Sequence, residues 1–239
     1  MKPCVWITRP EGQNRVTAKK LERMGFAPLL TPLLSVVPLP LPPLPDQPFD
    51  GIILTSAHAV TALTTWAATR RDLPTLPILT TGKATATAAQ RAGFETVHAF
   101  QGDVPHVLGS ARGVLGPAAG ALLYPCAAQT AHDLPTLAQQ HGFTCTALPV
   151  YATHPIHALS AEMQSRWDAG DIGAVLLYSP RTARAFAQLM DQPPARPPVL
   201  ACLSPTIAKA MPAPWQTHAV WPDTPCEEVL LQRLKAALN

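Results

Sequence analysis

Short apolar segments alternate with longer amphipathic segments along the whole chain. The apolar segments have the length and the Val, Ile and Leu content of buried strands. We expect strands or extended segments at 5–8, 28–37, 52–55, 78–81, 96–99, 121–124, 148–151, 174–178, 199–203 and 217–220. We expect helices at 13–24, 57–69, 83–92, 130–141, 181–190, 206–211 and 227–238. Buried strands that alternate with helices indicate an α/β fold with parallel sheets.

The two halves of the chain resemble each other. Three motifs recur in the same order, with Gly25-Phe26 repeated as Gly142-Phe143, Ser56 as Ser179, and Gly82 as Ser204. The separations are 117, 123 and 122 residues, so they agree closely. This period is too long for a solenoid repeat and suits a whole domain. The pattern therefore favours a duplication.

Proline is unusually frequent, at 28 of 239 residues, and six of these prolines fall within 38–48. Such a stretch is extended and stiff, so we interpret it as a spacer. The segment 152–157 occupies the equivalent place in the second half. The chain thus has two candidate linkers, one after the second strand of each half.

Composition and charge exclude several classes of protein. Lys and Arg exceed Asp and Glu by only 18 to 15, and no long basic run occurs, so we expect no nucleic-acid partner. No apolar stretch approaches the length of a membrane span, so we expect no membrane association. The five cysteines form no Cys-x-x-Cys pair, which favours buried structural thiols and a cytoplasmic location.

Hydroxyl side chains follow most of the predicted strands. They occur at Thr8, Thr55-Ser56, Thr81-Gly82, Ser179 and Ser204-Pro205-Thr206. In open α/β sheets, ligands bind outside the carboxyl ends of the strands, where helix N-termini favour anions. Ser and Thr before helices are also ordinary N-caps, so capping is the alternative for each residue taken singly. Their recurrence in both halves favours a ligand site.

Charged side chains add little to this candidate site. Arg9 stands beside a strand end and could meet an anionic substrate. The basic residues of the first helix (Lys19, Lys20 and Arg23) fit a solvated face better.

Common catalytic and metal-binding signatures are missing. Gly82-Lys83 resembles the end of a phosphate-binding loop, but Ala84 follows it and the leading Gly is absent. His154-x-x-His157 falls in a candidate linker without a Glu-bearing helix, so we expect no metal site.

One family contains a similar collinear set of motifs. The set comprises Thr8-Arg9-Pro10-Glu11-Gly12, Gly25-Phe26, Pro32-Leu33, the segment 50–60, Gly82-Lys83-Ala84-Thr85-Ala86, Val150-Tyr151, the segment 178–183, the segment 202–208 and Trp221-Pro222-Asp223-Thr224-Pro225. In this set and its order, the chain resembles the uroporphyrinogen-III synthase family over nearly its whole length.

The resemblance implies two flavodoxin-like, three-layer, parallel-sheet α/β domains joined by a two-stranded connector. One domain would combine 1–36 with 153–239, and the other would comprise 38–151, with linkers at about 36–48 and 151–157. Each domain would then take its first βαβ unit from one half of the chain and its remainder from the other.

The resemblance also implies an enzyme. Members of the family cyclise linear hydroxymethylbilane to uroporphyrinogen III in heme biosynthesis, with loss of water and inversion of ring D, and without a metal or organic cofactor. We therefore expect a monomer that binds hydroxymethylbilane. The preceding enzyme of the pathway would transfer this substrate to it in a transient complex. Loss of the hydroxyl leaves an azafulvene that closes unaided without inversion, so the enzyme must chiefly position its substrate.

Site residues follow by their match to the family motifs. Tyr151 is the expected proton donor, because a phenol with a pKa of about 10 stays protonated at neutral pH. A packed aromatic residue at the hinge is the alternative for Tyr151. The expected substrate contacts are Thr8, Arg9, Thr55, Ser56, Gly82, Lys83, Thr85, Ser179, Ser204 and Thr206. The family often has Gly where Ser204 stands, and this side chain would narrow the approach to the backbone.

Other functions remain open from the residues alone. A non-catalytic two-domain protein could clamp a small anionic ligand with the same strand-end hydroxyls. A two-domain glycosyltransferase would have a similar architecture, but its nucleotide-recognising carboxylate and Gly-rich catalytic loop are not evident. A structural α/β protein would use the hydroxyls only as helix caps.

Overall fold

The protein forms two compact units in a computed structural model that describes residues 2–10, 13–100, 102–130 and 133–238. Unit 1 comprises the chain up to Ser35 and from His154 onward, and unit 2 comprises Val36–Thr153. Each unit contains one sheet, and the strand pairs are parallel except for β3 (Leu34–Pro38) with β8 (Thr144–Pro155). The expected class, parallel-sheet α/β with two sheets, is confirmed.

Unit 1 has the strand order β11-β10-β9-β1-β2. Its elements are β1 (Cys4–Ile7), α1 (Gln13–Arg23), β2 (Ala27–Leu30), α6 (Ala161–Asp168), β9 (Ile172–Leu177), α7 (Pro180–Met190), β10 (Val199–Cys202), α8 (Pro205–Lys209), α9 (Ala213–Gln216), β11 (Ala219–Val220) and α10 (Glu227–Leu238). Alternate residues of β1 pack on opposite faces of the sheet. Val5 packs in one hydrophobic cluster with Leu21 of α1 and Leu230 of α10, whereas Trp6 packs in another with Phe186 of α7. The unit therefore has three layers.

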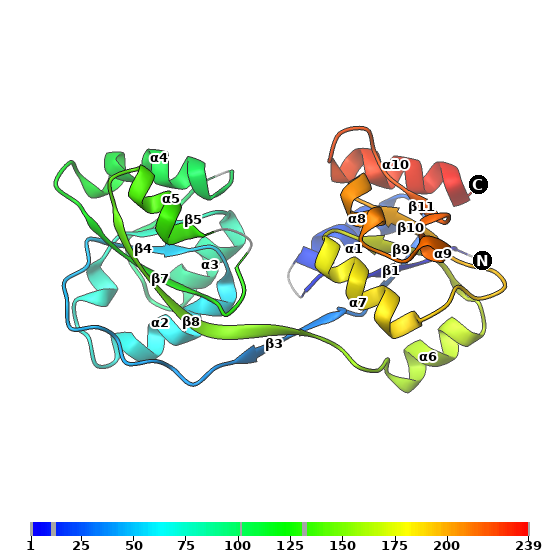
Figure 1. The fold of residues 1–239 in the computed structure, drawn as a ribbon, viewed down its shortest axis with the longest axis horizontal. Helices are drawn as coiled ribbons and strands as arrows, with labels where there is room; N and C mark the ends of the chain where they lie inside the picture. Colours follow the sequence, from blue (N-terminus) through cyan, green and yellow to red (C-terminus); the bar gives the residue numbers. More distant parts are fainter. Residues whose placement is uncertain (1, 11–12, 101, 131–132, 239) are drawn as a thin grey trace. The chain divides into compact units, whose positions relative to one another are not determined.

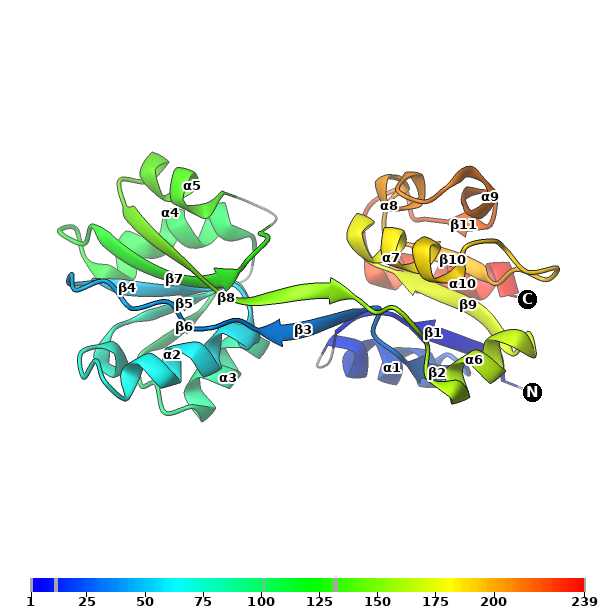
Figure 2. The same ribbon diagram turned by 60° about the horizontal axis from the view of Figure 1, so that its bottom comes forward.

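Unit 2 has the order β3-β8-β7-β4-β5-β6. Its elements are β3 (Leu34–Pro38, which begins in unit 1), β4 (Gly51–Leu54), η1 (Ala57–Ala59), α2 (Val60–Ala67), η2 (Leu73–Thr75), β5 (Ile78–Thr80), α3 (Lys83–Arg91), β6 (Val97–Ala99), α4 (Val104–Leu115), β7 (Ala121–Ala127), α5 (Leu134–Gln140) and β8 (Thr144–Pro155). Ile52 packs with α2, whereas Ile53 packs with α4 and α5. Figure 2 shows α4 and α5 on one face of this sheet and α2 and α3 on the other.

Five strands of each sheet follow the order 2-1-3-4-5 of flavodoxin-like folds when each unit starts from its own βαβ, and β3 adds a sixth strand beside β8 in unit 2. In unit 1 that βαβ is β1-α1-β2, and the other strands are β9, β10 and β11. In unit 2 it is β7-α5-β8, and the other strands are β4, β5 and β6. Each unit thus combines a βαβ from one half of the chain with the remaining strands of the other half, as a duplication with exchange requires.

Two neighbouring strands carry the chain between the units. β3 and β8 lie side by side, and Figure 1 shows them as the blue and green strands of the connector. They run antiparallel, because Leu39 N donates to Val150 O (3.0 Å) while Ile156 N donates to Leu33 O (3.0 Å). The chain passes from one unit to the other at Ser35–Val36 and at Thr153–His154.

The proline-rich segment 38–48 lies against unit 2 instead of forming a free spacer. Leu41 and Leu44 pack on the core formed by β4 and α2. The indole Nε1 of Trp66 donates to Pro42 O (3.2 Å), and Arg70 Nη1 donates to Pro45 O (3.1 Å). Proline lacks an N–H but keeps its carbonyl, so beyond Pro38, where β3 ends, this stretch can accept bonds from α2 and the turn after it without adding a further strand to the sheet.

Candidate active site

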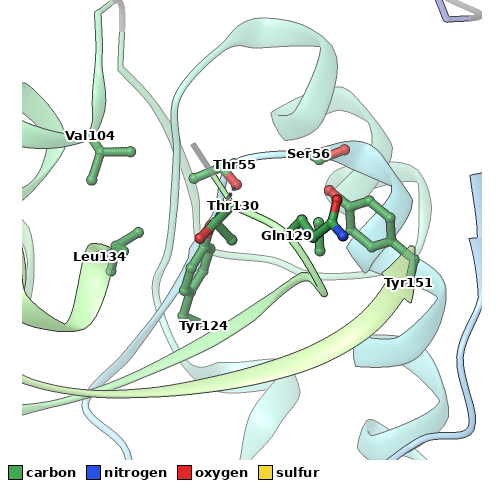
Figure 3. Close-up of a pocket in the computed structure, with 9 residues that line it drawn as sticks. Thr55, Ser56, Val104, Tyr124, Gln129, Thr130, Leu134 and Tyr151 are labelled. Carbon is green, nitrogen blue, oxygen red and sulfur yellow. Dashed lines mark hydrogen bonds between the residues drawn. The ribbon is translucent and has the colours of Figure 1, made fainter. Parts of the chain in front are cut away.

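The candidate site lies in unit 2, at the carboxyl ends of β4 and β7. This is the place where the chain order of the strands reverses, because β7 pairs with β8 on one side and β4 on the other. A cavity of about 190 Å³ opens there. Its lining consists of Thr55, Ser56, Val104, Tyr124, Ala127, Gln129, Thr130, Leu134 and Tyr151 (Figure 3). The described lining residues carry hydroxyl, amide and apolar groups without a formal charge.

A bulge in β8 positions Tyr151. Along β7 and β8, Cys126 pairs with Pro149, but the next residue, Ala127, pairs with Tyr151. Val150 is therefore an extra residue, and such a bulge changes the direction of the side chains that follow it. The Tyr151 carbonyl still accepts from Ala128 N (2.8 Å), which holds the strand in place beyond the bulge.

The phenol of Tyr151 is buried and stays protonated at neutral pH. The residue is only 8% exposed, and burial raises its pKa above the usual value of a phenol. A hydrogen bond with the Ser56 side chain opposes this rise in pKa. Figure 3 shows the Tyr151 ring extending from β8 toward Ser56, across the cavity from Tyr124. The ring of His58 packs beside Tyr151, with 5.7 Å between the ring centroids.

A second phenol faces the same cavity. Tyr124 of β7 lies with its hydroxyl 3.3 Å from Thr55 Oγ1, and burial raises the pKa of this phenol as well. The consecutive residues Thr55 and Ser56 at the end of β4 thus hold one tyrosine each. Tyr124 was not among the predicted site residues, because it falls inside an apolar strand segment. Gln129 stands two residues after the end of β7, as Arg9 stands two residues after the end of β1, and this equivalence is the signal that could have found Gln129 and its neighbour Thr130.

The other predicted site residues of unit 2 lie at the neighbouring strand end. β5 is adjacent to β4, and Gly82 and Lys83 follow it at the start of α3. Gly82 O accepts from Thr80 Oγ1 (3.1 Å), Lys83 is exposed, and Thr85 is buried. None of these three predicted residues lines the cavity around Tyr151.

In unit 1, two predicted hydroxyls support the local backbone. Thr8 is buried, and its Oγ1 donates to Leu176 O (2.6 Å). Ser179 is the N-cap of α7, and its Oγ accepts from Thr182 N (3.1 Å). Ser204 occupies the N-cap position of α8 without a side-chain cap bond, and Thr206 is exposed. Ser179 therefore caps a helix, which was the alternative considered for each of these hydroxyl residues.

Arg9 belongs to a charged cluster around Glu227, the first residue of α10. The Glu227 carboxylate accepts from Arg9 Nη1 (3.0 Å), Thr17 Oγ1 (2.7 Å) and Tyr178 OH (2.9 Å), and it also pairs with Lys20. Burial raises the pKa of Glu227, but the hydrogen bonds from Lys20, Thr17 and Tyr178 outweigh it and lower the pKa below its usual value. Lys20 therefore helps to join α1 to α10, and the expectation of a purely solvated face is wrong for it.

The described residues contain no cluster of three or more His, Cys, Asp or Glu side chains that could hold a metal ion. All five cysteines are unpaired, and burial raises the pKa of the Cys126 thiol to about 11 and that of Cys202 to about 12. Within the described part of the chain, no helix is long and apolar enough to cross a membrane.

Comparisons with known proteins agree on one family. Residues 15–232 match the family model described as uroporphyrinogen-III synthase HemD. The structure is similar to the crystal structure of uroporphyrinogen-III synthetase from Helicobacter pylori 26695, with 20% identity, a TM-score of 0.62 and 100% of both chains covered. It is also similar to a mutant uroporphyrinogen III synthase from the extremely thermophilic bacterium Thermus thermophilus, with 16% identity, a TM-score of 0.53 and 98% of both chains covered. No curated protein sequence gives a significant match.

Proposed function

The chain belongs to the uroporphyrinogen-III synthase family, and from this premise we propose that the cavity beside Tyr151 is its reaction site. The protein is an enzyme that cyclises linear hydroxymethylbilane to uroporphyrinogen III in heme biosynthesis, with loss of water and inversion of ring D. Its substrate is a small tetrapyrrole. The observation that supports this site is the buried, protonated phenol of Tyr151, which faces a neutral cavity and is paired with Ser56.

Tyr151 acts first as a general acid. Its O–H donates a proton to the hydroxyl of the hydroxymethyl group, the C–O bond breaks, and water leaves with the bonding electrons. An azafulvenium cation remains on the substrate, with its pyrrole N–H retained, and a phenolate remains on the enzyme. Burial disfavours this phenolate, so the Ser56 hydroxyl has a direct role: it donates a hydrogen bond to the oxygen on which charge develops.

The proton returns at the end of the reaction. The substituted carbon of ring D attacks the methylene carbon of this cation, the spiro intermediate fragments to a second azafulvenium cation, and the ring recloses at the free position. The last pyrrole carbon then loses a proton, and the phenolate of Tyr151 accepts it, so the enzyme is unchanged. The cavity has a volume of about 190 Å³, so it restricts the orientations that the reacting end of the bilane can adopt. This restriction favours attack by the substituted carbon of ring D over attack by its free position.

Tyr151→Phe tests the acid role. We expect this variant to form isomer III at least about 100-fold more slowly, the usual contribution of a general acid. The ring still packs against His58, so the thermal midpoint should not change. The assay supplies hydroxymethylbilane, oxidises the products and separates isomers I and III by chromatography. An unchanged rate for the variant would remove Tyr151 from the acid role, and a wild type that yields only isomer I would refute the site altogether.

Several strand-end residues remain proposed substrate contacts. These are Arg9, Thr55, Ser56, Gly82, Lys83, Thr85, Ser179, Ser204 and Thr206. Lys83 is exposed at the start of α3, which suits contact with a substrate carboxylate. For Thr8 we propose a structural role instead, because its buried hydroxyl donates to Leu176 O.

We also propose that the enzyme works as a monomer in the cytoplasm. Five unpaired cysteines support a reducing compartment. Because the bilane closes unaided, a transient handover from the enzyme that makes it would limit formation of isomer I. Sedimentation of the protein alone and with that enzyme tests both the oligomeric state and the handover, and a stable homodimer would contradict the monomer.

A further inference from the structure

A second, larger hollow lies on another side of Tyr151. This groove has a volume of about 480 Å³ and belongs entirely to unit 2. It is lined by Val36, Pro38, Leu39, Leu41, Ala57, His58, Thr61, Ala62, Thr65, Val150 and Tyr151. Its walls are thus β3, the start of the proline-rich segment, one face of η1 and α2, and the bulge of β8. Tyr151 lines both the groove and the reaction cavity.

The walls of the groove are held by contacts within unit 2 that need no ligand. Leu39 N donates to Val150 O (3.0 Å), and Leu41 packs on the core of unit 2. One residue further, Pro42 O accepts from the indole of Trp66. Proline fixes φ along this stretch, so the segment loses little further freedom when a ligand binds. The groove is therefore formed before any ligand arrives.

The size of the groove complements that of the reaction cavity. Small-molecule sites usually measure about 300 to 1,000 Å³, so the groove falls within this range and the reaction cavity, at about 190 Å³, falls below it. A linear tetrapyrrole cannot fit in the reaction cavity beyond its reacting end. The rest of the molecule needs another surface, and the groove adjoins the cavity through their shared residue, Tyr151.

The lining of the groove suits a flat ring that carries an acid side chain. Leu39, Leu41 and Val150 supply apolar walls, and the Tyr151 ring offers an aromatic surface. The polar groups gather on η1 and α2, as the imidazole of His58 and the hydroxyls of Thr61 and Thr65. Few polar groups in an otherwise apolar pocket are typical of a site that orients its ligand.

We propose that this groove is a substrate subsite, and that it binds a pyrrole ring of the bilane remote from the reacting hydroxymethyl group. The ring packs against Val150 and Tyr151, and its acid side chain meets His58 and Thr61. This subsite rests on the proposed function of the Tyr151 cavity. Binding of the remote ring against Tyr151 holds the phenol toward Ser56, so that remote binding energy contributes to positioning the acid.

Adjacent threonines of α2 provide a matched test of occupancy. Thr65 lines the groove and Thr64 does not, although both are exposed and each Oγ1 donates to a carbonyl four residues earlier. We expect Thr65→Trp to fill the groove and raise KM for hydroxymethylbilane about tenfold or more, with isomer III still the product. Thr64→Trp should keep the wild-type KM. Equal KM values for the two variants and the wild type would overturn the subsite.

A pair of charge changes tests the acid side chain of the ligand. Thr61 is exposed and lines the groove, so we expect Thr61→Lys to lower KM and Thr61→Glu to raise it by a similar factor. The same changes at Thr64 measure the general effect of charge on a polyanionic substrate and should give a clearly smaller shift. Shifts at Thr61 that have the same sign, or that equal those at Thr64, would overturn the proposal.

The wild-type assay separates the two proposals. If wild type forms isomer III and the Thr65 and Thr64 variants behave alike, the reaction site stands and the subsite fails. If wild type forms only isomer I, the proposed reaction site fails and the subsite fails with it.

Discussion

Replacing Glu227 by Gln removes one charge from the centre of the cluster that joins β1, α1 and α10. The Glu227 side chain is 16% exposed and pairs with Arg9 and Lys20, which are themselves partly covered. Glutamine has nearly the same shape, so the variant keeps one acceptor oxygen but presents an amide NH2 in place of the other. The two cations then lose their shared partner without any change in packing volume.

The expected loss of stability follows from these contacts. Hydrogen bonds to charged groups contribute about 1.5–3 kcal/mol each, and breaking a fully buried ion pair costs about 3–5 kcal/mol. Because Arg9 and Lys20 reach solvent in part, we expect the lower end, a loss of about 3 kcal/mol in the free energy of unfolding. At about 2–4 °C per kcal/mol for a chain of this size, the thermal midpoint falls by roughly 6–12 °C.

The effect should depend on pH in a defined direction. The hydrogen bonds lower the pKa of Glu227 in the folded state, so its carboxylate stabilises the fold at pH values above the ordinary Glu pKa of about 4.3. That stabilisation is lost as the pH falls through the lower, folded-state pKa. The difference in stability between wild type and Glu227→Gln should therefore be full at pH 7 and shrink in acid.

Thermal unfolding followed by circular dichroism at pH 7 and at pH 3 measures both effects. Glu228→Gln is the matched control, because Glu228 also accepts from Lys20 (2.6 Å) but its side chain is 69% exposed. Solvent screens such a pair, so its loss should leave the midpoint nearly unchanged. Equal shifts for the two variants, or a Glu227→Gln effect that grows in acid, would refute this account of the cluster.

Two further predictions concern the second phenol and the backbone. Tyr124→Phe removes one neutral hydrogen bond of about 1 kcal/mol from the cavity, so kcat/KM for isomer III should fall about tenfold or less. This loss should be smaller than the loss in Tyr151→Phe. A larger loss in Tyr124→Phe would indicate that Tyr124, and not Tyr151, is the general acid. Gly142→Ala should lower the thermal midpoint, because Gly142 has φ +76° and an added Cβ would lie 2.7 Å from Arg112 Nη2. Gly113→Ala, in open space on α4, should raise the midpoint by the helix propensity of Ala. A rise for Gly142→Ala would contradict the first expectation, and a fall for Gly113→Ala would contradict the second.

The alternation of apolar strands and helices was sufficient to predict the fold class. The recurrence of Gly25 at Gly142, both with positive φ after a helix, is also visible in the sequence and marks equivalent helix ends in the two units. Three α-helices of the described chain were not predicted, namely α4, α6 and α9, the last of which has only four residues. α4 contains Gly109 and Gly113, which weaken its helical pattern, and the short α6 has a single buried side chain, so its amphipathic signal is faint.

By itself, the sequence determined that hydroxyls stand at the ends of parallel strands, and its resemblance to the family made Tyr151 a candidate acid. Only the tertiary structure decided how each hydroxyl is used. Ser56 meets the Tyr151 phenol, whereas Ser179, its counterpart in the other half, caps α7. The difference arises because the bulge of β8 and the neighbouring strand β7 bring Tyr151 and Tyr124 to the end of β4. These side-chain contacts depend on the order and register of strands that are far apart in the chain. Local patterns of polarity do not encode strand order or register.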